Sequence, residues 1–333
     1  MITIALDAMG GDFAPRVPVA AAAQASREGF ASILLVGDQA ALAQELARHR
    51  HDSRYVHILH APQTVGMEDA ASSVLREKPQ ASVRVACELV AAGQAQAVVS
   101  AGHSGALMVA GKHALGALPG MERPAIVTTL PLRHGATALL DSGANVDCKP
   151  HYLLQFAQVG AVYARRVLGV AAPRVGLLSN GAEPGKGNDL VRQAYALLAA
   201  SGLDFVGNVE ARDLFKGRAD VLVCDGFVGN VVLKTAEAVS QQLRLLTKDA
   251  ALRSPLAMLG YALARPFFAE LLRRTDYHEI GGSPLLGLGH VAIVCHGSSN
   301  ASTIASALRV AARCVEQGLV GEIARAMATA GAG

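Results

Sequence analysis

Apolar runs that break into glycine-rich turns and then into helical stretches recur along the chain, and this alternation limits the folds available to it. The first unit consists of the strand-like run Ile2–Ala8, the turn DAMGGD and an alanine-rich helical stretch over Val17–Glu28. Ser32–Asp38 and Val56–Ala61 repeat the strand pattern around a helical stretch at Gln39–Arg48. Strands that alternate with helices are typical of a mostly parallel sheet covered by helices. We therefore predict an α/β protein.

The chain is long enough for one large domain or two modest ones. Its 333 residues are 51% hydrophobic but only 4% aromatic, and they include 34 glycines. This mixture suits strands that are buried on both faces by helices. We predict a single α/β domain over residues 1–333, with a helical segment at about 235–278.

Charge and cysteine content argue against several classes of protein. A net charge of +3, without a basic run among aromatics, predicts no nucleic-acid partner. Five scattered cysteines without a CxxC pair predict neither a disulfide framework nor a metal site. The N-terminus enters a strand without a signal peptide, and no window of 18 uncharged apolar residues is present. We expect a cytosolic chain that does not span a membrane.

A glycine-rich loop with one lysine lies in the stretch Arg174–Asp189, which reads RVGLLSNGAEPGKGND. An apolar strand leads into this loop, and Asn188 or Asp189 is a suitable N-cap for the amphipathic helix that follows. Lys186 would then stand beside the positive end of a helix dipole, where a phosphate would relieve the repulsion. An ordinary turn with a solvated lysine explains the same pattern equally well. The loop is not a Walker A motif, because Gly187 follows the lysine where that motif has Ser or Thr.

A second strand, turn and helix, in the stretch Gln96–Gly105, supports a rival interpretation. Residues 102–106 read GHSGA, which nearly matches the nucleophile elbow GxSxG of serine hydrolases. The late histidines that such an enzyme needs, His290 and His296, lie in a strand-like run without a separate catalytic signal. We favour Ser104 as an anchor for a ligand oxygen, and the serine hydrolase stays as an alternative.

Three more polar turns follow strand-like runs later in the chain. The stretch Leu139–Pro150, LLDSGANVDCKP, gathers several hydrogen-bonding side chains in one loop. Asp225–Asn230, DGFVGN, is expected to open a helix at Val231, and GSSN at residues 297–300 precedes a helical stretch over Ala301–Gln317. Because ligands of open α/β sheets bind outside the carboxyl ends of the strands, we expect the lysine loop, the GHSG turn and DGFVGN to converge on one crevice, which GSSN could also line.

Two short motifs are weaker indicators of function. In the first turn we expect Asp12 to cap the Gly-Gly pair, whereas Asp7 could either cap the turn or orient a catalytic group or a metal. Gly287–Ala292 matches the dinucleotide fingerprint GxGxxA by letters, but a strand-like run follows where that fingerprint requires a helix. We therefore predict no dinucleotide or other cofactor.

Leucines and phenylalanines recur at helical spacing among the arginines between Arg244 and Asp276, where Pro255 and Pro266 interrupt the pattern. Such an apolar surface needs cover from a second subunit or from lipid. We picture two helices that meet near Pro255–Arg265 and project from the α/β body. Their tip would present four residues to a membrane or a partner: Met258, Leu259, Tyr261 and Arg265.

From end to end, the chain resembles the phosphate acyltransferases of the PlsX type. DAMGGD, LLDSGANVDCKP, NGAEPGKGN, DGFVGN and HGSSN are similar to that family's motifs in order and spacing. The sequence departs from the pattern at residues 102–105, GHSG, where the family has Asn-Thr in the middle. The resemblance implies an isopropylmalate-dehydrogenase-like, three-layer α/β/α fold with a projecting helical hairpin, a homodimer and peripheral membrane association.

The family transfers a fatty acyl group from acyl carrier protein to inorganic phosphate and so makes acyl phosphate for phospholipid synthesis. The resemblance implies that Lys186 holds phosphate and that Asn230 donates a hydrogen bond to the carbonyl oxygen as it becomes negative. It also assigns phosphate or substrate binding to residues in the matching motifs: Gly10, Gly11, His103, Ser104, Gly105, Asp141, Asn145, Gly185, Gly187, Asn188, Asp225, Gly229 and Ser298.

The resemblance further implies acyl carrier protein, a second subunit, the membrane surface and a membrane-bound glycerol-3-phosphate acyltransferase as partners. Three functional hypotheses follow from the sequence. They are an acyltransferase that uses phosphate as acceptor, a serine hydrolase or thioesterase that uses Ser104, and a noncatalytic sensor of anions or acyl phosphate.

Overall fold

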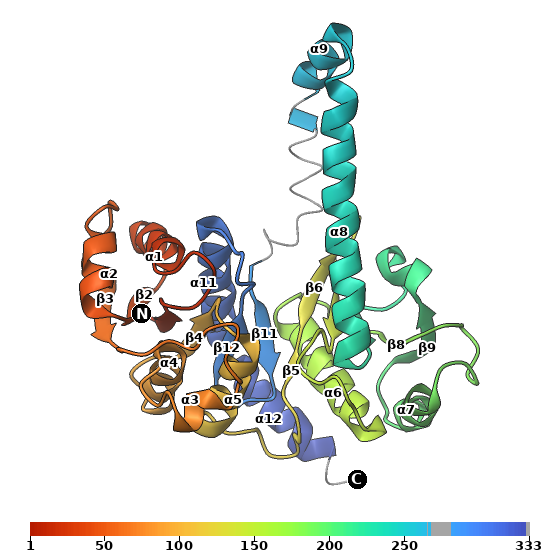
Figure 1. Cartoon of the computed structure of the whole chain (residues 1–333). Coiled ribbons are helices and arrows are strands. Elements are labelled where there is room, and N and C mark those ends of the chain that lie inside the picture. Colours follow the sequence, from red (N-terminus) through yellow and green to blue (C-terminus); the bar gives the residue numbers. More distant parts are fainter. Residues whose placement is uncertain (265, 268–280, 331–333) are drawn as a thin grey trace.

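The computed structural model describes residues 1–264, 266–267 and 281–330, in which helices pack against two β-sheets. Figure 1 shows the two sheets side by side, with the long helix α8 (Gly226–Ala251) rising away from them. Most neighbouring strands are parallel, so the predicted α/β class is confirmed. The division of the strands between two sheets is a feature that the sequence did not reveal.

The first sheet contains seven strands. Their order is β3 (Val56–His60), β2 (Ser32–Gly37), β1 (Thr3–Asp7), β4 (Ala97–Ser100), β12 (Val291–Val294), β11 (Ser283–Leu286) and β5 (Ala125–Ile126). The strands from β3 to β12 are parallel, and β11 is antiparallel to both of its neighbours. Because Ser100 pairs with Asp7 on one side and with Val294 on the other, β1, β4 and β12 end at one edge.

Alternate residues of β1 point into different layers, as the two-residue period of a strand requires. Ile4 and Leu6 belong to a buried cluster that includes residues of α1 (Arg16–Glu28) and α11 (Ala301–Glu316). Ala5 belongs to a second cluster, with residues of α4 (Ser82–Ala91) and α5 (Ser104–Ala114). The first sheet is therefore the middle of three layers.

The second sheet contains five strands in the order β6 (Thr128–Pro131), β7 (Ala136–Leu140), β10 (Val221–Val223), β8 (Val175–Ser179) and β9 (Phe205–Glu210). Only β6 is antiparallel to its neighbour. Helices α6 (Pro150–Arg166) and α7 (Asp189–Ala199) contribute to the core on one face. Val228 and Val232, in the first turns of α8, pack on the opposite face.

One apolar run takes part in both sheets. The sequence predicts a single strand over Ala125–Pro131, paired with a second strand around the turn at Arg133–Gly135. The pairing is confirmed for β6 and β7, but the run divides at Val127, and β5 pairs with β11 in the first sheet. Both halves of the run are apolar, so their composition does not reveal the change of sheet. The two sheets are consequently joined at this point.

Helix boundaries agree closely with the sequence pattern at several places. The Asn188 side chain accepts a hydrogen bond from Val191 N at 2.9 Å, so the predicted N-cap of α7 is confirmed. Pro15 precedes α1 without a side-chain cap bond. The remaining described elements are α2 (Gln39–Leu46), α3 (Ser73–Arg76), the 3₁₀ helix η1 (Ala211–Lys216), α9 (Pro255–Leu263) and α12 (Leu319–Ala330).

The predicted projection is present. Figure 1 shows α9 at the far end of α8, and the Ser254 side chain caps α9 by accepting a hydrogen bond from Ala257 N at 3.1 Å. The fourth residue expected at the tip, Arg265, lies outside the described residues. None of the helices in the described ranges combines the length and the apolar character that a membrane crossing requires.

Candidate active site between the two sheets

A buried carboxylate organises the edge of the first sheet where β1 and β4 end. Asp7 is 2% exposed and accepts hydrogen bonds from Ser82 Oγ and Ser100 Oγ, both at 2.6 Å. Burial raises the pKa of Asp7, and the bonds from Ser100 and Ser82 oppose that rise. Since Ser100 Oγ also accepts from Gly102 N at 3.1 Å, Asp7 positions the turn after β4. The structure thus places Asp7 as a positioning group for that turn.

Two glycines allow the turns after β1 and β4 to touch. A Cβ atom on Gly10 would lie 2.4 Å from Asp7 Oδ2 and 2.7 Å from Gly102 N, which is closer than real Cβ atoms come. Gly11 has a φ of +104°, which L side chains rarely adopt. Beside it, Asp12 N donates to Gly297 O at 2.9 Å, so the turn after β12 joins the same group. Three of the predicted turns therefore converge.

A second buried carboxylate organises the loop after β7. Asp141 is fully buried, and its Oδ1 accepts hydrogen bonds from the backbone N atoms of Ile126, Gly143 and Ala144 at 3.0 to 3.2 Å. Its Oδ2 accepts from Asn145 N at 2.7 Å and from Asn145 Nδ2 at 2.9 Å. Burial raises the pKa of Asp141, while these bonds act to lower it. The density of polar groups in this loop thus serves to build the loop itself.

Helix α8 begins on top of this loop. Gly226 N donates to Asn145 O at 2.7 Å, and Asp225 caps the helix by accepting from Val228 N at 2.9 Å. The helix therefore starts at Gly226, five residues before the predicted start, and the prediction that DGFVGN is a turn ahead of the helix is wrong. A Cβ atom on Gly229 would lie 1.9 Å from Asp141 O, so the close packing requires glycine. Asn230 follows directly and lies near Gly143, on the second turn of α8.

A cavity of about 290 Å³ is lined by residues of both sheets. Gly102 and Ser104 reach it from the first sheet, and Gly143 and Asn230 reach it from the second. The turn after β12 contributes His296, Gly297 and Ser299, and its neighbour Ser298 is exposed and does not line the cavity. The expectation of one shared crevice is confirmed for the GHSG turn, the residues DGFVGN and the GSSN turn, and the loop after β7 joins them.

A charged cluster connects α8 to the turn after β12. Glu237 Oε2 lies 2.8 Å from Lys234 Nζ, and Glu237 Oε1 lies 3.4 Å from His296 Nε2. Lys234 Nζ is also 3.3 Å from His296 Nδ1. Although burial acts to raise it, the hydrogen bonds from His296 and Lys234 lower the pKa of Glu237 to about 2. Since Asn230 and Glu237 lie about two turns apart on one helix, this cluster helps to fix Asn230 over the cavity.

The surroundings of Ser104 and His296 test the serine hydrolase alternative. Ser104, Glu237 and His296 line one cavity in the chain order of some serine hydrolases. However, the two ring nitrogens of His296 lie against Glu237 and Lys234, and the described residues show no hydrogen bond between Ser104 Oγ and a histidine. His103 Nδ1 accepts from Ala106 N at 3.2 Å and so caps α5. This geometry lacks the nucleophile–base contact that the hydrolase needs.

The loop with the lysine does not line the cavity, so its expected convergence with the other turns is not confirmed. Lys186 is exposed and is not part of the cavity lining, and neither are Gly185, Gly187 and Asn188. The loop follows β8, which is a direct neighbour of β10 in the second sheet, so it lies beyond the turn that starts α8. Asn208 Nδ2 holds this loop by donating to Glu183 O at 2.7 Å. Gly105, at the start of α5, and Asn145, under α8, adjoin the cavity turns without lining it.

Several lining residues carried no functional signal in the sequence. Thr129, Tyr163 and Val310 belong to a strand and two helices, where each reads as an ordinary core residue. Glu237 could have been found, because it lies seven residues after Asn230 on a predicted helix and so shares its face. Throughout the described ranges, no group of three or more metal-ligating side chains occurs.

Comparisons with known proteins agree with this architecture. A family described as "Fatty acid synthesis protein" matches residues 2–321. A protein named phosphate acyltransferase from Nitratidesulfovibrio vulgaris (strain DP4) is 50% identical over 315 residues, which cover 94% of this chain and 91% of that protein. A protein of the same name from Geobacter sulfurreducens is 48% identical over 326 residues, 98% of this chain and 94% of that protein.

Among solved structures, a phosphotransacetylase from Streptococcus pyogenes is similar with a TM-score of 0.62 and 18% identity, covering 95% of this chain and 94% of that one. The EutD phosphotransacetylase from Staphylococcus aureus gives a TM-score of 0.60 at 16% identity, with 94% and 93% covered. At such identities the similarity concerns the fold alone.

Proposed function

This chain belongs to the fatty acid synthesis protein family, and we propose that it transfers a fatty acyl group from an acyl carrier protein thioester to inorganic phosphate, giving acyl phosphate for phospholipid synthesis. The observation that carries this proposal is the match along nearly the whole chain to relatives named phosphate acyltransferase. The cavity supports it, because hydroxyl and amide groups from both sheets meet where strands end and helices begin.

The reaction needs a held phosphate, a stabilised carbonyl oxygen and a leaving thiolate. A phosphate oxygen attacks the thioester carbon, the new C–O bond forms, and the C–S bond breaks. The proton of hydrogen phosphate ends on the thiolate, so no oxidant, metal or covalent enzyme intermediate is required. Asn230, at the cavity beside Gly143, is suited to donate a hydrogen bond to the carbonyl oxygen as it gains charge.

Lys186 does not line the cavity, and we propose it as an exposed cation that attracts phosphate toward the neighbouring strand ends, since β8 lies directly beside β10. Its loop precedes the N-terminus of α7, where the helix dipole favours an anion.

We expect Lys186→Ala to raise the phosphate concentration for half-maximal rate by about tenfold, because one charge-assisted hydrogen bond to phosphate is lost. Steady-state rates at varied phosphate measure this. Lys216→Ala, an exposed lysine after β9, is the control, and an unchanged phosphate dependence in Lys186→Ala would remove the assignment.

The function itself is tested by incubating the pure protein with an acyl carrier protein thioester, with and without phosphate. Acyl phosphate should form only with phosphate, and intact-mass spectrometry during turnover should show no acyl adduct on the protein. Hydrolysis that needs no phosphate, together with an acylated Ser104 peptide, would support the hydrolase instead. Binding of the thioester without any turnover would support the noncatalytic sensor.

We further propose a homodimer whose shared surface lies along α8. Among the apolar side chains of this helix that are about half exposed or more are Val231, Val239, Leu243 and Leu246. They recur at intervals of eight, four and three residues and so form one stripe, which a second copy of α8 would cover. Basic residues near its end, such as Lys248 and Arg253, would attract an acidic acyl carrier protein.

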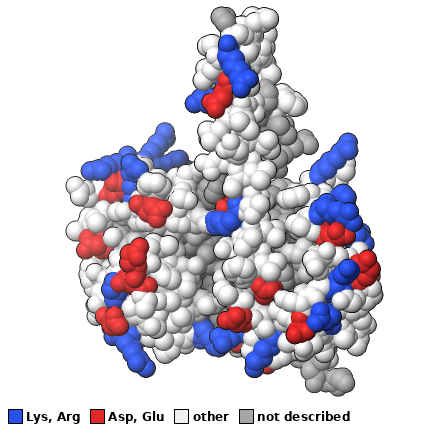
Figure 2. All heavy atoms as spheres, turned by 45° about the vertical axis from the view of Figure 1, so that its right-hand side comes forward, with Lys and Arg blue, Asp and Glu red and all other residues white. Residues whose placement is uncertain are grey.

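The tip of the projection is the proposed contact with the cytoplasmic membrane surface. Figure 2 shows few acidic or basic side chains on the projection, and Leu256, Leu259 and Leu263 are 79%, 57% and 75% exposed. Met258 is 52% exposed beside them, and Tyr261 lies on the same helix. Contact here would bring acyl phosphate, which is reactive and apolar, close to a membrane-bound glycerol-3-phosphate acyltransferase.

Mutations at the tip and on the shaft of α8 distinguish the proposed membrane contact from the proposed subunit interface. The double replacement Met258→Glu and Leu259→Glu should abolish flotation with phospholipid vesicles, because charge opposes insertion of the tip. Dimer mass and turnover of a soluble thioester should stay unchanged. The matched variant Leu243→Glu, on the shaft of α8, should instead produce monomers. If the tip variant becomes monomeric, those residues belong to the subunit interface and the membrane proposal fails.

A further inference from the structure

The turn after β12 brings a buried hydroxyl without a hydrogen-bond partner to the cavity. Ser299 is 3% exposed and lines the cavity, and its Oγ makes no hydrogen bond within the described part of the chain. A buried polar atom that lacks a partner costs free energy, so native structures contain few of them. A ligand oxygen that accepted a hydrogen bond from Ser299 Oγ would remove this cost.

The other hydroxyl groups of the cavity wall are either paired or exposed. Among the described residues, six more lining hydroxyls lie within hydrogen-bond distance of another side chain: Thr128, Thr129, Ser142, Tyr163, Ser283 and Thr303. Ser104 lines the cavity too, but it is exposed, so water can pair with its hydroxyl. Burial and the lack of a partner therefore single out Ser299.

The N-terminus of α11 makes this part of the wall suitable for an anion. Ser299 directly precedes Asn300, whose Oδ1 caps the helix by accepting a hydrogen bond from Thr303 N at 2.9 Å. The dipole of this 16-residue helix favours negative charge at that end. Ser104, the first residue of α5, lines the same cavity, so a second helix start adjoins it. Neither helix carries an acidic side chain in its first turn.

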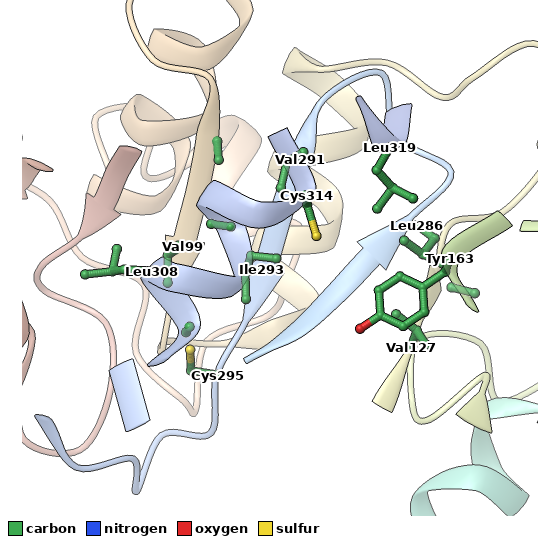
Figure 3. Close-up of a cluster of buried hydrophobic side chains, with 14 of the residues drawn as sticks. Val99, Val127, Tyr163, Leu286, Val291, Ile293, Cys295, Leu308, Cys314 and Leu319 are labelled. Atoms are coloured by element: carbon green, nitrogen blue, oxygen red, sulfur yellow. The ribbon is translucent and has the colours of Figure 1, made fainter. Parts of the chain in front are cut away.

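The hydrophobic core fixes the turn at both ends. Ile293 in β12 and Cys295 directly after it belong to the same buried cluster as Leu308 of α11, and Figure 3 shows these side chains in that cluster. Within the turn, Ser299 N donates a hydrogen bond to His296 O at 3.0 Å. A donor on a turn that is held in this way loses little conformational freedom when it binds a ligand.

We propose that Ser299 Oγ and the N-terminus of α11 hold the acceptor phosphate inside the cavity. The inference rests on the proposed function, because phosphate is the acceptor of that reaction. Lys186 does not line the cavity, so a phosphate that attacks the thioester needs another donor there. Ser299 lines the same cavity as Asn230, the proposed donor to the carbonyl oxygen. Glu237 also lines it, but its carboxylate lies 2.8 Å from Lys234 Nζ, which opposes its negative charge.

Steady-state rates at varied phosphate and at varied acyl carrier protein thioester test the assignment. Ser299→Ala should raise the phosphate concentration for half-maximal rate about tenfold, because one hydrogen bond to a charged group is lost. The thioester concentration for half-maximal rate should stay unchanged. The matched control is Ser302→Ala, which removes an exposed hydroxyl from the first turn of the same helix, outside the cavity, and should keep the wild-type phosphate dependence.

Unfolding temperatures distinguish phosphate binding from a purely structural role of Ser299. Without phosphate, Ser299→Ala should unfold at the wild-type temperature or above it, because the substitution removes an unpaired buried polar atom. Inorganic phosphate should then raise the unfolding temperature of wild type and Ser302→Ala more than that of Ser299→Ala. These measurements need no turnover, so they test the site even if the wild-type protein makes no acyl phosphate and the proposed function fails.

An unchanged phosphate dependence in Ser299→Ala would overturn the proposal. A larger rise in Ser298→Ala would do so too, because that variant removes the neighbouring, exposed hydroxyl. A change confined to the thioester dependence would mean that Ser299 binds the acyl donor, which also contradicts the proposal. If Ser299→Ala does not fold, Ser299→Cys, which keeps only a weak S–H donor, replaces it and is judged by the same outcomes.

Discussion

Replacement of Asn230 by alanine should lower kcat by about 10² to 10³, the usual effect of removing one oxyanion donor. The side chain lines the cavity beside Gly143, and the loop beneath it is fixed by the buried carboxylate of Asp141. A donor in a fixed position costs little reorganisation when the carbonyl oxygen becomes negative. The loss should therefore appear in kcat, with KM for both substrates nearly unchanged. Rates at saturating thioester and phosphate measure it.

A matched control for this variant is Gln241→Ala, which removes an exposed amide from the same helix outside the cavity. This control should leave kcat and KM unchanged. A higher KM with a normal kcat in Asn230→Ala would mean that the amide binds substrate and transition state equally, which contradicts the oxyanion role. An unchanged unfolding temperature would confirm that the variant measures chemistry.

The sequence predicts the local units of this fold well because their signals are local. Asn188, Asp225 and Asn300 each cap the helix that follows, and each cap comes directly after a strand or its turn. The division of the Ala125–Pro131 run could not be predicted in the same way. Which sheet β5 joins depends on pairing with β11, and β11 comes more than 150 residues later in the chain.

Residues of the site can be predicted from the sequence where they follow a strand directly, but not where they belong to the hydrophobic core. Gly102, Ser104 and Asn230 lie in turns or helix starts just after strands, which a parallel sheet brings to one edge, and the cavity includes them. Val310 and Tyr163 are indistinguishable in sequence from neighbours such as Val315 that only pack. Whether an apolar side chain faces a cavity depends on how α6 and α11 approach each other across two sheets.

The start of α8 shows how a tertiary contact reverses a local preference. Glycine is about 1 kcal/mol less favourable than alanine inside a helix, so the sequence DGFVGN predicts a turn and a later start of the helix. In the structure the helix includes both glycines of that motif. Gly226 packs against Asn145 O and Gly229 against Asp141 O, each at a distance that excludes a Cβ atom.

Gly229→Ala should therefore destabilise the protein, although alanine is the better helix former. Its Cβ atom would lie 1.9 Å from Asp141 O and 2.9 Å from Asp141 C, and backbone atoms cannot move aside as a flexible side chain can. Overpacking typically costs about 1 to 3 kcal/mol, which exceeds the helix gain. We expect a lower free energy of unfolding by denaturant. We also expect reduced kcat, because the same displacement shifts Asn230 from its position in the cavity wall.

The matched control is Gly321→Ala in α12, where the nearest heavy atom to an added Cβ is Arg325 Nη1 at 3.9 Å. There the helix preference acts alone, so this variant should be as stable as wild type or up to about 1 kcal/mol more stable, with normal turnover. Equal stability changes in the two variants would contradict the contact between Gly229 and Asp141. If Gly229→Ala loses stability but keeps an unchanged kcat, the contact between Gly229 and Asp141 stabilises α8 without positioning Asn230. The proposed link between this contact and catalysis would then fail.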